Sequence, residues 1–199
     1  MPKVVDYFFT PVSPWTYLGG ARLDAMVRRH GVELRYKPCD YGKVFPVSGG
    51  LPVGQRPKQR QAYRLMELER WRDHLGIPLN IHPKHFPVAS DFAARTIVAA
   101  KQSGADPGKL TSALLRAVWV EERDVSDRAT VAAICNEGGL DGKALVEAAD
   151  GAAARAEFDA NTAEAIERQV FGAPTYIYRD KLYWGQDRLD FLDRALAAG

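Results

Sequence analysis

The pattern of hydrophobic and polar positions is that of strands at both ends of the chain and of helices in the middle. Val4–Thr10 is a run of β-branched and aromatic residues, which predicts a buried strand. Ser13 and Pro14 are typical of a helix start, and apolar residues then recur at helical spacing up to Gly31. Val32–Cys39 alternates apolar and polar side chains, which predicts a second strand. The chain therefore opens with a β-α-β unit.

The middle of the chain has the pattern of helices separated by glycine breaks. A stretch rich in Gly and Pro at 48–57 predicts a loop, and apolar positions among many charges over Lys58–Leu75 predict one long amphipathic helix. Sequences rich in Ala, Leu and Glu predict four more helices at about Ser90–Gln102, Lys109–Glu122, Asp127–Asn136 and Gly151–Val170.

Strand-like segments return near the C-terminus. Thr175–Tyr178 and Leu182–Trp184 flank the pair Arg179-Asp180, which predicts a hairpin, and Asp187 is expected to open a closing helix. A β-α-β unit and a β-β-α unit are the two halves of a thioredoxin-type sheet. We therefore predict an α/β, thioredoxin-like fold with a large all-helical insertion.

The two halves of this sheet are more than 100 residues apart in the sequence, so the helical segment is expected to be a folded insertion. We predict a thioredoxin-like domain formed by residues 1–47 and 171–199, and a helical insertion domain formed by residues 48–170.

Composition excludes several classes of protein. The 199 residues are 46% hydrophobic with a net charge of +2, which disfavours disordered, collagenous and nucleic-acid-binding proteins. The two cysteines, Cys39 and Cys135, form no Cys-x-x-Cys motif and no zinc-type cluster, so no metal site is predicted and a reducing compartment is indicated. With no signal peptide pattern and no run of about 18 apolar residues, we expect a cytoplasmic protein without membrane contact.

The first candidate site is the turn after the first strand, where backbone N–H groups and the helix dipole favour a negative charge. A redox thioredoxin places Cys-x-x-Cys there, but this chain reads Ser13-Pro14-Trp15-Thr16. Hydroxyls cannot exchange electrons, but the hydroxyl of Ser13 can donate a hydrogen bond to a thiolate of another molecule. The alternative is that Ser13 is only a helix N-cap.

The second candidate site is Phe171-Gly172-Ala173-Pro174-Thr175, just before the hairpin. Pro174 read alone is an ordinary trans proline at the start of a strand. In a thioredoxin-type sheet, however, this proline is cis and faces the active turn, and the main chain of the preceding residue is free to pair with an extended peptide.

The order and spacing of four segments resemble the glutathione-dependent 2-hydroxychromene-2-carboxylate isomerases, relatives of the kappa-class glutathione transferases among DsbA-like thioredoxin proteins. These segments include Asp6-Tyr7-Phe8 with Ser13 to Leu18, Glu69-Arg70-Trp71 with Gly76 to Leu79, Ala165-Ile166-Glu167 with Val170 to Thr175, and Trp184 to Leu189. The match covers most of the chain.

The resemblance implies a glutathione site. Ser13 is then the catalytic residue that holds the glutathione thiolate, and the main chain of Ala173 before cis-Pro174 pairs with the cysteinyl part. The implied contacts also include Trp184, Gly185, Gln186 and Asp187, of which Gln186 and Asp187 take the γ-glutamyl end. The alternative for Asp187 is a simple N-cap.

Basic residues and histidines complete the expected site. The resemblance gives Lys58 to the glycyl carboxylate of glutathione, and Arg56 is expected to clamp the substrate carboxylate. Otherwise the run Arg56, Lys58, Arg60 and Arg64 is a solvated helix face. We expect His82 on the surface, whereas His85 lines the substrate pocket or lies in a surface loop.

The leading hypothesis is an isomerase that interconverts 2-hydroxychromene-2-carboxylate and trans-o-hydroxybenzylidenepyruvate with glutathione as cofactor. The alternative is a kappa-class-like glutathione transferase that acts on small electrophiles. A thiol–disulfide oxidoreductase is disfavoured by the missing cysteines, and a non-catalytic thioredoxin-like binding module stays open. The resemblance further implies a homodimer and a small aromatic carboxylate as substrate.

Overall fold

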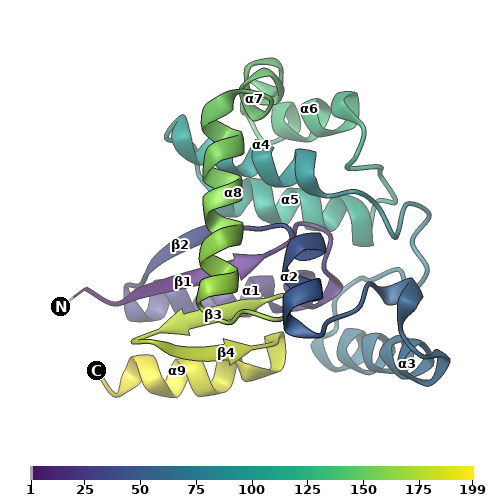
Figure 1. Ribbon diagram of the computed structural model, residues 1–199, viewed down its shortest axis with the longest axis vertical. Coiled ribbons are helices and arrows are strands. Elements are labelled where there is room, and N and C mark those ends of the chain that lie inside the picture. The colour runs from purple at the N-terminus through teal and green to yellow at the C-terminus, as the bar shows by residue number, and fades with distance from the viewer. Residues whose placement is uncertain (1) are drawn as a thin grey trace.

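The computed structural model describes residues 2–199 and contains one four-stranded sheet (Figure 1). Its strands are β1 (Val4–Phe9), β2 (Glu33–Pro38), β3 (Thr175–Tyr178) and β4 (Lys181–Trp184), in the order β2-β1-β3-β4. The pair β1–β2 is parallel, and the pairs β1–β3 and β3–β4 are antiparallel. The two ends of the chain thus build one sheet, as the sequence predicted.

The predicted local signals account for two of the three connections in the sheet, β1 to β2 and β3 to β4. The side chain of Ser13 caps α1 (Pro14–His30), which ends at Gly31 in the left-handed conformation with a φ of 61°. The β3–β4 turn places Arg179 and Asp180 at φ values of 49° and 59°, and two successive positive φ angles are what a two-residue hairpin needs.

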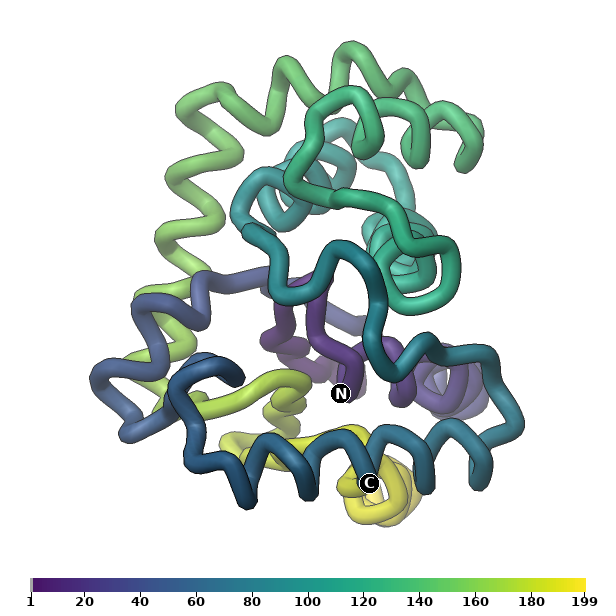
Figure 2. The backbone as a smooth tube through the Cα atoms, turned by 90° about the vertical axis from the view of Figure 1, so that its right-hand side faces the viewer, coloured from purple at the N-terminus to yellow at the C-terminus, as the bar shows by residue number. Residues whose placement is uncertain are grey.

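Between β2 and β3 the chain forms a series of helices, while α1 lies behind the sheet and α9 (Leu189–Ala197) packs on α1 and β4 (Figure 1). The series includes the long α3 (Lys58–Leu75), followed by α4 (Asp91–Gln102), α5 (Pro107–Trp119), α6 (Arg128–Glu137) and α8 (Ala152–Glu167). Figure 2 shows α3 running apart from α4 and α5, with segment 76–90 joining them. Helix α8 packs on α4 at one end and on α2 and β2 at the other.

The sequence analysis missed two short helices, α2 (Tyr41–Ser48) and α7 (Gly142–Ala149). Each is eight residues long and begins after an aspartate cap, Asp40 or Asp141. Two helical turns give too few apolar positions for a clear period, and Pro46 inside α2 argues against a helix. The closing helix also begins later than predicted, because Asp187 lies in a 3₁₀ turn at Gln186–Arg188 that precedes α9.

Aromatic side chains of the sheet form the centre of the main core. The ring of Tyr7 stacks between those of Phe9 and Tyr176, with centroids 4.5 and 5.2 Å away. The indole of Trp119 from α5 is fully buried, and its Nε1 donates to the main-chain oxygen of Val12. Helix α5 is therefore fixed to the loop that follows β1.

The helical insertion shares its core with the sheet, because α5 packs against α1 and α4 packs against β2. The division into two domains, with boundaries at 47/48 and 170/171, stays a prediction. In the described part of the chain, no helix has both the length and the apolar character that crossing a membrane requires.

Candidate active site

A cavity of about 1090 Å³ opens at the end of β1 where α1 begins. It is lined by the loop after β1, by α2 and the segment that follows it, by one face of α3, and by segments 86–91, 171–173 and 184–188. A ligand pocket measures about 300–1,000 Å³, so this cavity lies at the upper end of that range.

Ser13 lies in the wall of this cavity and is 8% exposed. Its Oγ accepts a hydrogen bond from the main-chain N–H of Thr16 at 3.3 Å, which caps α1. The same hydroxyl donates to the main-chain oxygen of Ala173 over 3.5 Å, the long limit for a hydrogen bond. The cap therefore uses the oxygen, and the proton is held only weakly and is available to a stronger acceptor.

The loop at Ala173 faces Ser13 across the cavity wall, and the Ala173–Pro174 peptide bond is cis, as predicted. Within residues 2–199, no backbone hydrogen bond is formed by the N–H of Ala173, which precedes β3. Tyr41 Oη donates to the main-chain oxygen of Gly172 at 3.1 Å and holds the loop from α2. A Cβ on Gly172 would lie 2.3 Å from Trp184 Nε1, so this position requires glycine.

Segment 184–187 borders the cavity, but its side chains differ in direction. Gln186 is 2% exposed, and its main-chain oxygen and Oε1 both accept from Arg22 of α1. The side chain of Gln186, which the resemblance assigns to ligand binding, thus anchors this segment to α1.

Asp187 caps neither its own 3₁₀ turn nor α9, so the N-cap interpretation is wrong. In the described chain its carboxylate pairs only with Arg188, at 3.1 Å. Trp184 is 48% exposed and packs on Phe171.

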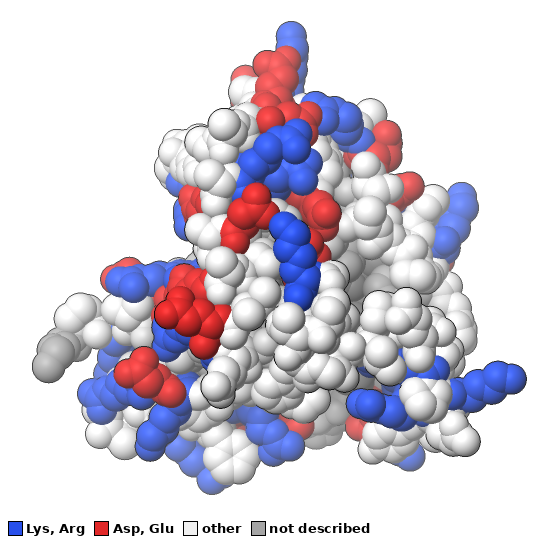
Figure 3. Space-filling view, in the orientation of Figure 1, with Lys and Arg blue, Asp and Glu red and all other residues white. Residues whose placement is uncertain are grey.

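Basic side chains on one side of α3 reach the cavity, and Figure 3 shows Lys and Arg atoms gathered where α3 lies. Arg56, Arg60 and Arg64 all line it. The Nε of Arg56 donates to the main-chain oxygen of Leu51 at 2.8 Å, and burial together with repulsion from Arg60 lowers the pKa of Arg56. Arg64 is 8% exposed, so the solvated-face interpretation is wrong for this residue.

The comparisons with known proteins agree with this geometry. A family model described as a DSBA-like thioredoxin domain matches residues 4–197. The 2-hydroxychromene-2-carboxylate isomerase of Sphingobium xenophagum is 30% identical over 197 residues, covering 98% of this chain and 99% of the relative. The chain belongs to this isomerase family of DSBA-like thioredoxin proteins.

Two further relatives support the assignment of the chain to this family. A solved structure of 2-hydroxychromene-2-carboxylate isomerase superimposes with a TM-score of 0.79 at 28% identity, covering 98% of this chain and 95% of that one. Human glutathione S-transferase kappa 1 is 23% identical over 209 residues, covering 98% of this chain and 92% of the relative. The predicted thioredoxin-like fold with many inserted helices is thereby confirmed.

Two of the predicted site residues, Lys58 and His85, do not line the cavity. Lys58 is exposed and does not line it, because the inward face of α3 follows Arg60, Arg64 and Trp71 at helical spacing and Lys58 falls outside that series. His85 does not line it either, since its Nδ1 lies 3.8 Å from Asp124 Oδ2 and the ring is held in the surface loop. His82 is exposed, as predicted.

Neither cysteine of this family member can act as a thiolate at neutral pH. Burial raises the pKa of the Cys39 thiol to about 12 and that of Cys135 to about 11. Both thiols are buried and free. Among residues 2–199, no group of three His, Cys, Asp or Glu side chains has a geometry that could hold a metal ion.

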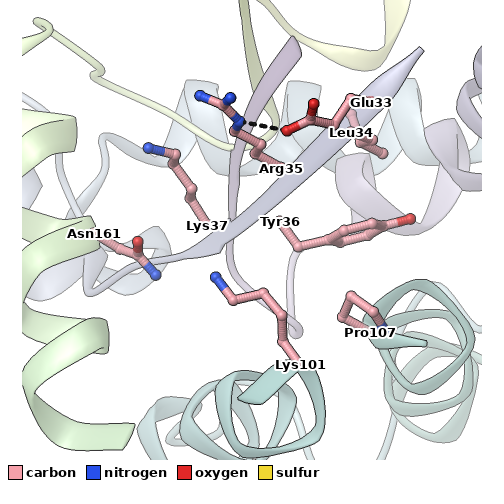
Figure 4. Close-up of a pocket in the computed structure, with 8 residues that line it drawn as sticks. All are labelled: Glu33, Leu34, Arg35, Tyr36, Lys37, Lys101, Pro107 and Asn161. Carbon is pink, nitrogen blue, oxygen red and sulfur yellow. Dashed lines mark hydrogen bonds and ion pairs between the residues drawn. The ribbon is translucent and has the colours of Figure 1, made fainter. Parts of the chain in front are cut away.

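A second depression of about 330 Å³ lies along the outer strand β2 and is lined by residues such as Tyr36, Lys37 and Lys101 (Figure 4). Its cations are compensated within the chain. Lys37 lies near Asp6 and Glu164, Lys101 pairs with Glu157, and Arg35 pairs with Glu33. These pairs leave little positive charge for a ligand, so this depression is not a candidate anion site.

Proposed function

We propose that this protein is a glutathione-dependent isomerase that interconverts 2-hydroxychromene-2-carboxylate and trans-o-hydroxybenzylidenepyruvate. One observation carries the proposal: at the start of α1, in the position of a redox cysteine, a serine hydroxyl lies in the wall of a large cavity and its only acceptor among residues 2–199, the main-chain oxygen of Ala173, is at the long limit of 3.5 Å. A site with a hydroxyl but no thiol fits an enzyme that activates the thiol of a bound cofactor.

The residues of the cavity fit glutathione, which is a small extended peptide with charged ends. The unpaired N–H of Ala173 suits the main chain of the cysteinyl residue. Asp187, which caps no helix, suits the γ-glutamyl ammonium. Arg56 and Arg60 line the cavity from the α3 side and suit the glycyl carboxylate, the role first expected for Lys58. The side-chain hydroxyl of Thr10 is also buried in this wall without a partner among residues 2–199.

When bound, glutathione would supply a thiol nucleophile for reversible addition to the conjugated double bond of the ring-opened substrate, and would be returned unchanged. Residues of the chain stabilise the thiolate and hold the sulfur in position. The hydroxyl of Ser13 donates a hydrogen bond to the sulfur and keeps its proton, and the N-terminus of α1 adds positive potential, so that the thiolate is favoured over the thiol. The loop at Ala173 fixes the sulfur in place, which raises its effective concentration.

A kappa-class-like transferase would use the same residues, and the kappa-class relative keeps this alternative open. The two functions differ in what happens to glutathione, which a transferase consumes and an isomerase returns. The expected cytoplasmic location and the homodimer stay predictions.

The test follows the absorbance of 2-hydroxychromene-2-carboxylate as it isomerises, with and without glutathione, and measures free thiol at the end. We expect isomerisation that depends on glutathione with no loss of thiol. Equal rates without glutathione would exclude the proposal. Loss of free thiol in proportion to the substrate consumed would favour the transferase. So would turnover of a halonitrobenzene without isomerisation of 2-hydroxychromene-2-carboxylate.

A further inference from the structure

Arg64 is a buried cation without a counter-ion in the wall of the cavity. It lies in the second turn of α3 and is 8% exposed, and its Nη2 is fully buried with no hydrogen-bond partner among residues 2–199. A guanidinium group carries five donors in a planar fork, so a buried one without an acceptor leaves a strong binding capacity unused.

The surroundings of Arg64 are aromatic and basic. Its guanidinium lies 5.2 Å from the ring centroid of Phe86 and 5.9 Å from that of Trp119. Burial, with repulsion from Arg56, lowers the pKa of Arg64 to about 10. The group is therefore still charged at neutral pH, and among residues 2–199 no carboxylate forms an ion pair with it.

Other cations buried to a similar degree do have carboxylate partners. Lys37, with 15% of its side chain exposed, lies near Asp6 and Glu164. Arg95, with 16% exposed, pairs with Asp150 at 3.4 Å. Buried charges are ordinarily paired because removing an ion from water is costly. Arg64 departs from this rule in the wall of the cavity that also holds Ser13.

We propose that Arg64 binds the carboxylate of the second ligand in this cavity, an aromatic acid whose ring packs beside Phe86. This inference rests on the proposed function and assigns the carboxylate of its substrate to Arg64, instead of to Arg56, which the proposed function gives to the glycyl carboxylate of glutathione. A planar fork fits a carboxylate with two parallel hydrogen bonds, and the aromatic wall fits the ring. The site therefore selects anionic aromatic substrates over neutral ones of the same shape.

The test compares trans-cinnamate with its neutral counterpart trans-cinnamamide, using titration calorimetry on the glutathione-loaded protein. The variants are R64M, R64K and, as a control on the same helix outside the cavity, R72M, which removes a surface pair with Asp73. We expect the wild type and R72M to bind cinnamate on the order of 10- to 100-fold more tightly than cinnamamide. R64M is expected to bind the two equally, and R64K to keep only part of the preference.

The same experiment separates this inference from the proposed function. If R64M keeps the preference for cinnamate, or if the wild type has none, Arg64 does not bind the carboxylate, whatever the isomerase assay gives. If the preference depends on Arg64 but the wild type is not an isomerase, the assignment stands and the proposed reaction is wrong. R64M is expected to melt no lower than the wild type, because it loses an uncompensated buried charge. If R64M does not fold, R64K decides the question. A preference for cinnamate in R64K as large as that of the wild type would show that Arg64 does not bind the carboxylate through two parallel hydrogen bonds.

Discussion

Ser13 uses the oxygen and the proton of one hydroxyl group for different purposes. The oxygen caps α1 through the N–H of Thr16, and the proton is directed at Ala173 over 3.5 Å. For Ser13→Ala we expect a loss of isomerisation kcat/KM on the order of 10²-fold, the effect of losing one donor to a developing anion. The same variant loses the cap, at about 1 kcal/mol of unfolding free energy. Steady-state kinetics and urea unfolding measure the two effects.

Ser13→Thr is the matched control, since threonine also caps helices and carries a hydroxyl. We expect it to keep most of the activity and the stability. If Ser13→Ala lowers stability but leaves kcat/KM within a factor of about three, well under 1 kcal/mol, Ser13 is a cap alone.

Asp187 is a ligand-binding candidate because it performs no structural task as a cap. Asp187→Asn removes the charge at nearly constant shape, and we expect glutathione affinity to fall by about 1.5–3 kcal/mol, the range for hydrogen bonds to charged groups. Its surface pair with Arg188 contributes about 0–1 kcal/mol, so the melting temperature should change little. Titration calorimetry of glutathione provides the measurement. Asp190→Asn, in the first turn of α9, is the control, and equal affinities for both variants would rule out the ammonium contact.

The candidate turn at Ser13 could be recognised from the sequence because its signals are local. Ser13 before Pro14 and the segment around Pro174 are recognisable within a few residues, and the structure brings Ser13 and Ala173 together. Arg64 was not recognised as a site residue, since nothing on α3 shows that Phe86 and Trp119 cover it. The contact of Gln186 with Arg22 was not foreseen for the same reason, because Arg22 is distant in sequence, and its predicted role in ligand binding stays a prediction.

At the scale of elements, one carboxylate joins three helices of the helical insertion. Asp150, between α7 and α8, pairs with Arg95 of α4, Arg128 of α6 and Arg155 of α8. Hydrogen bonding to Arg128, with the other two arginines, lowers the pKa of Asp150 below its ordinary value of 3.8. The stabilisation is therefore present above pH 3.8 and is lost as the pH falls through the lower folded-state pKa.

For Asp150→Asn we expect a lower urea midpoint than for the wild type at neutral pH. The difference should shrink as the pH is taken below 3.8 and through the lower folded-state pKa, where the wild-type carboxylate becomes protonated. Asp73→Asn, which breaks only a pair with neighbouring Arg72, is the control and should have a smaller effect. A difference that stays constant with pH would show that the three arginines do not act through the charge of Asp150.

Long elements with one clear period were predicted within a few residues, as for α3, whereas α2 and α7 were missed. Their two turns each are stabilised by tertiary contacts, α2 with α8 and α7 with α4 and α6. Such contacts join segments that a local pattern does not connect. The late start of α9 has a related cause, since Gln186 bends into the protein to meet Arg22 before the helix begins.

At the scale of the whole molecule, the fold is that of thiol–disulfide enzymes but the chain has no accessible thiol. Cys39 and Cys135 are buried, with pKa values raised to about 12 and about 11. We expect both thiols to react slowly with an aromatic disulfide reagent in the native protein and rapidly in denaturant, and we expect no reduction of insulin above background. Ser13→Cys should gain one fast-reacting thiol and form a mixed disulfide with glutathione. Fast labelling of the native wild type would contradict this account.

The central claim is that the sulfur of glutathione lies as a thiolate beside the hydroxyl of Ser13. A crystal structure of the protein with bound glutathione tests it most directly. The account predicts the sulfur within hydrogen-bonding distance of Ser13 Oγ, the cysteinyl main chain paired with Ala173 and the γ-glutamyl ammonium at Asp187. Glutathione bound elsewhere, or bound in the cavity with its sulfur turned away from Ser13, would contradict the account.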